Sequence, residues 1–135
     1  MLATLEQRHG ELLALMTTMR GLIANDRIDA DAVTKTRLGL GKASTARTRF
    51  LTDTIYPELL GRLAGSEAVQ VRELQAAAAT DRARSSAHVG KWSAAGIAQD
   101  WHGFRRDAVG ILAMMETRIA LEKRVLYPLL SRIRA

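Results

Sequence analysis

The chain has 135 residues, of which 47% are hydrophobic and 25% are charged. This length and balance are typical of one globular domain, so we expect a single domain over residues 1–135. The sequence contains no cysteine, which excludes disulfides, thiolate metal sites and cysteine catalysis. The N-terminus carries charge from Glu6 onward, and no apolar run approaches the roughly 18 residues that span a membrane. We therefore expect a soluble, cytoplasmic protein that does not bind membranes.

The net charge is +6 with neutral histidines, from 20 Lys and Arg against 14 Asp and Glu. A basic balance can indicate nucleic acid or an acidic partner. Here the basic residues are spread along the chain in short pairs such as Arg105-Arg106, and aromatic residues amount to only 4%. Nucleic-acid binders usually concentrate their charge and add exposed aromatic side chains. The pattern therefore favours a solvated surface, and nucleic acid is not the partner we expect.

Apolar residues recur at helical spacing throughout, without the alternation that is typical of strands. The pattern predicts four long helices joined by short loops, over residues 2–24, 29–63, 67–93 and 99–133. Asp29 or Asp31 is the expected N-cap of the second helix, and Ser66 that of the third. Because such helices are marginal alone, their apolar stripes must pack together. We expect an all-α fold, an up-down-up-down antiparallel four-helix bundle.

The third helix and the last turn have distinctive side chains. Residues 76–79 are all alanine, so neighbouring helices can pack closely there. Trp92 and Trp101 flank the last turn and are expected to pack at that end of the bundle. His88 and His102 lie near the same turn, and we expect them at the surface or at helix ends.

Two segments of the chain resemble each other. They are RTRFLTDTIYPELL (residues 47–60) and RIALEKRVLYPLLS (residues 118–131). Aligned on Pro57 and Pro128, they share an arginine at the start and a tyrosine before the proline. A proline late in a long helix removes a hydrogen bond and bends the axis. A bend repeated at one place predicts two copies of a helical hairpin packed about a pseudo-twofold axis.

The endings EKRVLYPLL and IYPELL, together with EQRHGELLALM around His9, resemble the hemerythrin-like family, the HHE cation-binding domain. The resemblance covers essentially the whole chain, and Tyr56-Pro57 and Tyr127-Pro128 form its repeated structural motif. It implies a four-helix bundle of two helical hairpins with an iron site in the core. From the residues themselves, we expect the hydroxyls of Tyr56 and Tyr127 to face solvent or a carbonyl.

Most of the metal ligands that the resemblance implies are missing. In the family, each half contributes a histidine from its first helix and His-x3-Glu from its second, a spacing that puts both side chains on one face. The two His-x3-Glu pairs fall on Arg47 and Leu51, and on Arg118 and Glu122. His9 and Glu122 are the ligands that remain. Two arginines beside them repel a cation, so we expect no metal cofactor; any metal would fall to His9 and Glu122.

Helix geometry predicts which of these residues meet. His9 and Arg47 lie nearly symmetrically about the first turn, so they should face each other, and Arg118 should meet the third helix near residues 75–79. We therefore expect a core polar network, or vestigial metal site, of His9, Arg47, Arg118 and Glu122. Guanidinium groups would satisfy the carboxylate there. The alternatives are arginines turned outward into solvent, or an anion pocket for a carboxylate, phosphate or small acidic metabolite.

The preferred functional hypothesis is a non-catalytic, metal-free relative that acts as a regulatory, sensory or interaction module, with an unknown protein partner or a small acidic ligand. A second hypothesis keeps non-haem iron for oxygen, nitric oxide or iron handling. A third is a basic helical protein that binds nucleic acid or an acidic partner. The sequence contains no recognisable nucleophile turn or acid–base pair, so we do not expect an enzyme. Helical bundles commonly dimerise along an apolar face, so we also consider a homodimer.

Overall fold

The computed structural model describes residues 1–134, which are almost entirely helical. The elements are α1 (Leu2–Ile23), α2 (Ala30–Phe50), the π-helical turn η1 (Leu51–Ile55), α3 (Tyr56–Arg62), α4 (Gly65–Lys91), α5 (Ala94–Gln99) and α6 (Trp101–Arg134). α2, η1 and α3 follow one another without a break and together form the second long helix. The described residues contain no strand, so the all-α prediction is confirmed.

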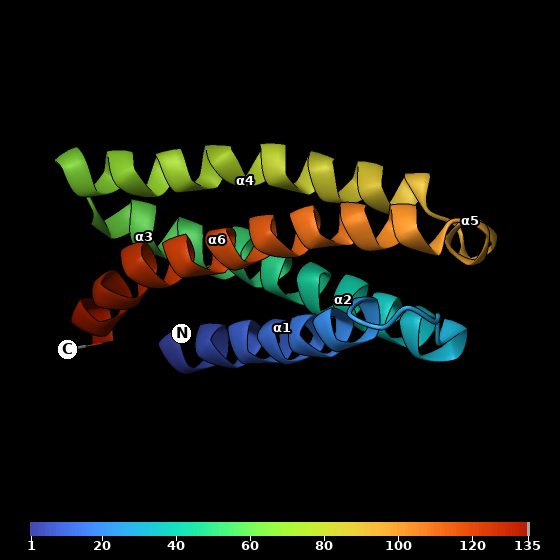
Figure 1. Cartoon of the computed structure of the whole chain (residues 1–135). Coiled ribbons are helices and arrows are strands. Elements are labelled where there is room, and N and C mark those ends of the chain that lie inside the picture. Colours follow the sequence, from blue (N-terminus) through green and yellow to red (C-terminus); the bar gives the residue numbers. More distant parts are fainter. Residues whose placement is uncertain (135) are drawn as a thin grey trace.

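Four long helical segments lie side by side, and consecutive segments run in opposite directions (Figure 1). α1 packs against α2 and α6, while α4 packs against α6 and α3. In contrast, α2 and α4 make hardly any direct contact along the described chain. The space between these two helices is a cavity, and residues of α6 also line it.

Local capping determines where α2 and α4 begin. The carboxylate of Asp29 accepts a hydrogen bond from the N–H of Ala32 at 3.1 Å, which confirms Asp29 as the N-cap of α2. The prediction that Ser66 caps the third helix is wrong, because α4 already begins at Gly65 after the extended residue Ala64. Gly65 has a φ of 61°, a left-handed conformation that glycine adopts without steric cost.

The turn before α6 contains the short helix α5, which is absent from the predicted elements. Ser93 caps α5 and Asp100 caps α6, each through a side-chain oxygen that accepts a backbone N–H. The rings of Trp92 and Trp101 pack on Phe104, with centroids 5.7 and 5.8 Å away. The two tryptophans therefore close this end of the core, as predicted.

The two prolines of the repeat are accommodated differently. Pro57 follows η1, where the N–H of Tyr56 bonds to the carbonyl of Leu51, five residues earlier. Pro128 lies inside α6, which turns away from its earlier axis toward its C-terminal end (Figure 1). A proline lacks an N–H and crowds the preceding turn, and both bends and π-helical turns relieve that crowding. The two copies of the repeat therefore differ in local structure.

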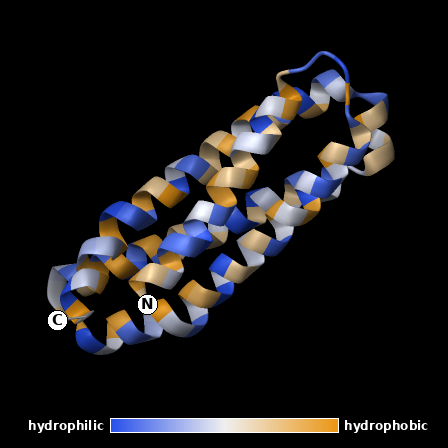
Figure 2. Cartoon of the chain, turned by 90° about the horizontal axis from the view of Figure 1, so that it is seen from below, coloured by the Kyte–Doolittle hydropathy of each residue, from blue (hydrophilic) through white to orange (hydrophobic). Residues whose placement is uncertain are grey.

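The core consists of two apolar clusters with polar residues between them. Figure 2 shows hydrophobic and hydrophilic residues alternating along the long helices, as expected when one stripe of each helix is buried. On α1, Leu5 belongs to one cluster and Leu12 to the other, and on α6 Val125 and Ile119 divide in the same way. The inward-facing positions between these residues therefore form a layer that separates the clusters.

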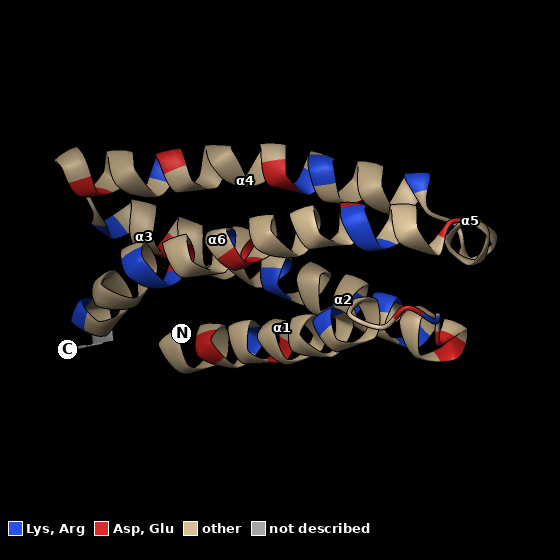
Figure 3. Ribbon diagram, in the orientation of Figure 1, with Lys and Arg blue, Asp and Glu red and all other residues tan. Residues whose placement is uncertain are grey.

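Charged residues occur on every long helix. Figure 3 shows Lys and Arg at intervals along α1, α2, α4 and α6 rather than gathered in one stripe. None of the described helices combines the length and the apolar character needed to cross a membrane.

Candidate functional site

Four polar side chains are buried between the two apolar clusters. His9 comes from α1, Arg47 from α2, and Arg118 and Glu122 from α6. His9 and Glu122 have no exposed surface, and Arg118 and Arg47 expose only 4% and 9%. Long charged side chains are almost never buried this completely unless they are paired. The structure thus brings together the four residues of the predicted network, and neither arginine is turned outward into solvent. We call this group the polar layer.

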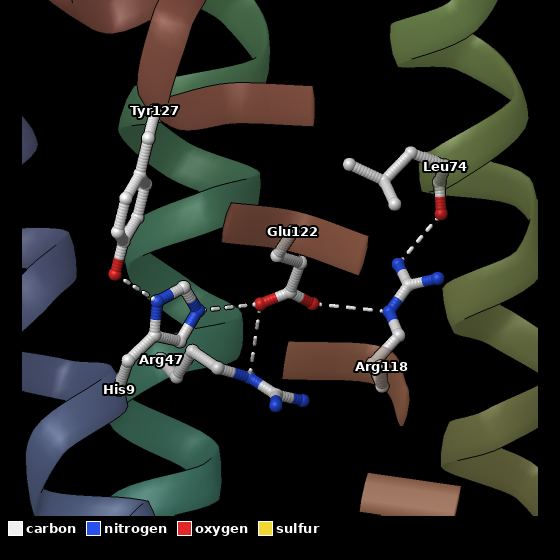
Figure 4. Close-up of polar contacts among 6 residues, drawn as sticks. All are labelled: His9, Arg47, Leu74, Arg118, Glu122 and Tyr127. Atoms are coloured by element: carbon white, nitrogen blue, oxygen red, sulfur yellow. Dashed lines mark hydrogen bonds and ion pairs between the residues drawn. The ribbon is translucent and has the colours of Figure 1, made fainter. Parts of the chain in front are cut away.

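The carboxylate of Glu122 is the centre of the polar layer (Figure 4). Oε1 accepts a hydrogen bond from Nε2 of His9 at 2.8 Å, and Oε2 accepts one from Nε of Arg118 at 3.0 Å. Nε of Arg47 lies 3.9 Å from Oε1, an ion pair without a hydrogen bond. Nη2 of Arg118 donates to the carbonyl of Leu74 at 2.6 Å. Arg118 therefore meets α4 one residue before the predicted range 75–79, and the network ties all four long segments together.

His9 uses both of its ring nitrogens. Nδ1 lies 2.6 Å from the hydroxyl of Tyr127. Because Glu122 accepts at Nε2, we assign the ring proton to Nε2, which leaves Nδ1 to accept a hydrogen bond from Tyr127. Burial, with the negative charges of Glu6 and Glu122, raises the pKa of Tyr127 to about 12. The Tyr127 hydroxyl therefore keeps its proton at neutral pH and extends the network.

The expectation that both tyrosine hydroxyls face solvent or a carbonyl is wrong. Tyr127 bonds to His9, and the hydroxyl of Tyr56 is buried without a hydrogen-bond partner. Burial and the charge of Glu122 raise the pKa of Tyr56 against the opposing effect of nearby arginines. The extra residue in η1 changes the direction of the side chains that follow it, so Tyr56 points into the core while Tyr127 is only half-buried.

Glu122 is held in its charged form. Burial is the largest single influence and by itself raises the pKa of this carboxyl. The hydrogen bond from His9 and the charges of Arg47 and Arg118 together outweigh it, so the pKa lies below the usual range. Glu122 is therefore an anion at neutral pH.

The other two histidines lie outside the polar layer. The half-buried ring of His88 has its centroid 5.7 Å from that of Phe104, in the apolar cluster near α5. His102 is exposed, with Nδ1 3.3 Å from a guanidinium nitrogen of Arg105. Both positions agree with the prediction, because His102 is exposed and His88 lies in the last turn of α4.

The residues of the polar layer do not fit the two-iron centre that the family resemblance implies. Both nitrogens of His9 and both oxygens of Glu122 already have protein partners. Arg47 and Arg118 add two positive charges beside the same carboxylate. Across the described part of the chain, no three His, Asp or Glu side chains form a group that could hold a metal ion.

A cavity of about 740 Å³ between α2, α4 and α6 reaches the polar layer. Arg47, Tyr56 and Arg118 all line it, and each has buried polar atoms without a hydrogen-bond partner. Ala78 lines the cavity too, so the alanines at 76–79 leave open space on the side of α2, while α4 packs against α6. Small side chains permit either close approach or open space, and here α2 stays apart from α4. No residue pattern in the sequence predicts this cavity.

No protein-family model, curated protein or solved structure matches the chain. The family resemblance therefore rests on the sequence motifs alone.

Proposed function

We propose that the protein is a metal-free relative of the hemerythrin-like family and acts as a non-catalytic regulatory, sensory or interaction module. In this proposal the long segments form an up-down-up-down antiparallel bundle of two hairpins, the first ending in α3 and the second in α6. The repeated tyrosine–proline motif and the alternating helix directions in Figure 1 support this arrangement. Four of the residues at the family's ligand positions form the polar layer, whereas Leu51 packs in an apolar cluster.

The observation that carries the proposal is the pairing of Glu122 with Arg118 and His9. Arg118 stands where the resemblance implies a histidine ligand, one helical turn before the carboxylate. A guanidinium group matches a carboxylate in charge and in hydrogen-bond geometry. The positive charge that a metal ion would bring to Glu122 is thus supplied by the chain itself.

The same pairing argues for a role without catalysis. A general acid must carry a proton near the working pH, whereas the lowered pKa of Glu122 keeps this carboxylate ionised. Its oxygens are also committed to His9 and Arg118. We therefore assign the polar layer to holding the helices together and to responding to a ligand or partner. The dispersed basic residues in Figure 3 give no support for a nucleic-acid surface.

Thermal unfolding with and without metal tests the proposal. The purified protein is unfolded with excess chelator and, anaerobically, with excess Fe(II). A ligand that binds only the folded state raises its stability, so we expect the same Tm in both conditions. A Tm that rises with iron in the wild type but not in His9→Gln would place a metal in the polar layer and contradict the proposal.

A further inference from the structure

The polar layer carries more positive than negative charge. Arg47 and Arg118 contribute two positive charges and Glu122 contributes one negative charge, so the layer has an excess of positive charge even with a neutral His9. A buried charge without a partner is costly, because it has lost its water. The balance in this layer therefore favours one additional negative charge.

The free hydrogen-bond donors show where that negative charge would bind. Nε and Nη1 of Arg47, Nη1 of Arg118 and the hydroxyl of Tyr56 are buried and make no hydrogen bond, although Nε of Arg47 lies 3.9 Å from Glu122. All three residues line the cavity between α2, α4 and α6. Figure 4 shows the outer nitrogens of Arg47 turned away from Glu122. Arg47 makes no hydrogen bond to Glu122, so its guanidinium is free to bind a carboxylate in bidentate fashion.

The remaining wall is suited to an apolar body. The rest of the lining combines apolar side chains with serine and threonine hydroxyls and the acidic side chains of Asp81 and Glu122. The apolar side chains include Leu40, Phe104, Ala108, Leu112 and Met115, and they make up most of the wall. Its volume of about 740 Å³ lies within the range of roughly 300–1,000 Å³ that is typical of small-molecule pockets. The cavity thus combines unpaired guanidinium nitrogens at the polar layer with a largely apolar wall.

We propose that this cavity binds an amphipathic organic acid, with its single carboxylate against the guanidinium of Arg47 and its apolar chain along α4 and α6. The inference rests on the proposed function, because it treats Arg47 and Arg118 as replacements for metal ligands. It names the chemical class of ligand to which the module would respond. The excess of one positive charge matches a monoanion rather than a more highly charged phosphate ester.

Calorimetric titration of the full chain with decanoate tests the ligand class. The controls are 1-decanol, which has the same chain without the charge, and acetate, which has the charge without the chain. We expect one decanoate per chain, bound about tenfold or more tightly than either control, because hydrogen bonds to a charged partner are worth at least that factor. Equal binding of decanoate and 1-decanol, or no saturable binding, overturns the proposal.

Substitutions in the wall locate the site. Ala78→Phe fills the cavity, whereas Ala79→Phe places the same ring on the exposed neighbouring residue, which does not line it. We expect decanoate binding to be lost in the first variant and unchanged in the second. Arg47→Met removes the charge but leaves both hydrogen bonds of Glu122, so it should weaken decanoate about tenfold or more while 1-decanol is unaffected.

One further outcome contradicts the proposal. Equal binding by Ala78→Phe and Ala79→Phe, both confirmed as folded by circular dichroism, would place decanoate elsewhere. The metal test is separate: an iron-dependent Tm overturns the proposed function, whereas a failure to bind decanoate with an iron-independent Tm overturns only the ligand.

Discussion

Glu122 balances two buried guanidinium groups, and within the described residues no other carboxylate pairs with them. A buried ion pair is not a large net source of stability, because the cost of removing the charges from water opposes their attraction. Removing one partner is different, since the remaining charges stay buried and uncompensated. The stability of the fold should therefore depend strongly on this one carboxylate.

Glu122→Ala should lower the free energy of unfolding by about 3–5 kcal/mol, because it leaves Arg47 and Arg118 without a counter-charge. Urea unfolding measures the loss. Glu116→Ala is the matched control, since Glu116 lies on the same helix and pairs with Arg20 at the surface. The control should lose no more than about 1 kcal/mol. A comparably small loss in Glu122→Ala would refute the network.

Stability should also follow the ionisation of Glu122. Its pKa is lower in the folded protein than the ordinary value of about 4.3. Folding therefore favours the ionised form, and this contribution is complete above the ordinary pKa and is lost as the pH falls through the folded value. Glu122→Gln cannot titrate. The difference in unfolding free energy between the wild type and this variant should be constant above about pH 5 and shrink at lower pH. Urea unfolding across this range would contradict the assignment if the difference grew in acid.

The long helices could be predicted because each has an apolar stripe over several turns, and the start of α2 because Asp29 is a strong cap. The six residues of α5 are too few to show a helical period. Nothing in the sequence distinguishes the two tyrosine–proline motifs strongly enough to predict η1 before only one of them. That single turn accounts for the buried hydroxyl of Tyr56. Tyr127 follows no such turn, and its hydroxyl lies against His9.

The first turn of α6 requires a glycine at position 103. The carboxylate of Asp100 accepts the N–H of Gly103 at 3.0 Å, and a Cβ on Gly103 would collide with that carboxylate. Gly103→Ala should break this cap and lower the free energy of unfolding by roughly 0.5–2 kcal/mol. Chemical denaturation measures the change.

Gly110→Ala is the control within the same helix. A Cβ there would make only an ordinary contact, with Arg84 at 3.8 Å. Because alanine favours helix over glycine, this variant should keep its stability or gain up to about 1 kcal/mol. If both variants responded alike, the cap at Asp100 would not determine the start of α6.

Across the whole molecule, the position of the polar layer could be predicted and the space beside it could not. His9 and Arg47 lie at one height because they are nearly symmetric about the first turn, and the repeat relates Arg47 to Arg118. The alanines at 76–79 are compatible both with a tight contact and with a cavity. The distance between α2 and α4 is set by packing throughout the molecule, which no local pattern in the sequence encodes.

The polar layer separates two apolar clusters, so it also favours one alignment of the helices. If a long helix shifted by one turn, an ionised or hydrogen-bonding group would face an apolar cluster without its partner, at a large cost. The residues of the polar layer therefore connect α1, α2, α4 and α6 at one level.

A metal-free polar layer is tested by the metal content of protein purified from iron-supplemented cells, measured together with its near-ultraviolet and visible absorption. Because guanidinium groups satisfy Glu122, we expect no stoichiometric iron and no absorption beyond that of the aromatic residues. Two irons per chain with the absorption bands of an oxo bridge would show that the polar layer rearranges around metal and that Arg47 and Arg118 do not replace it.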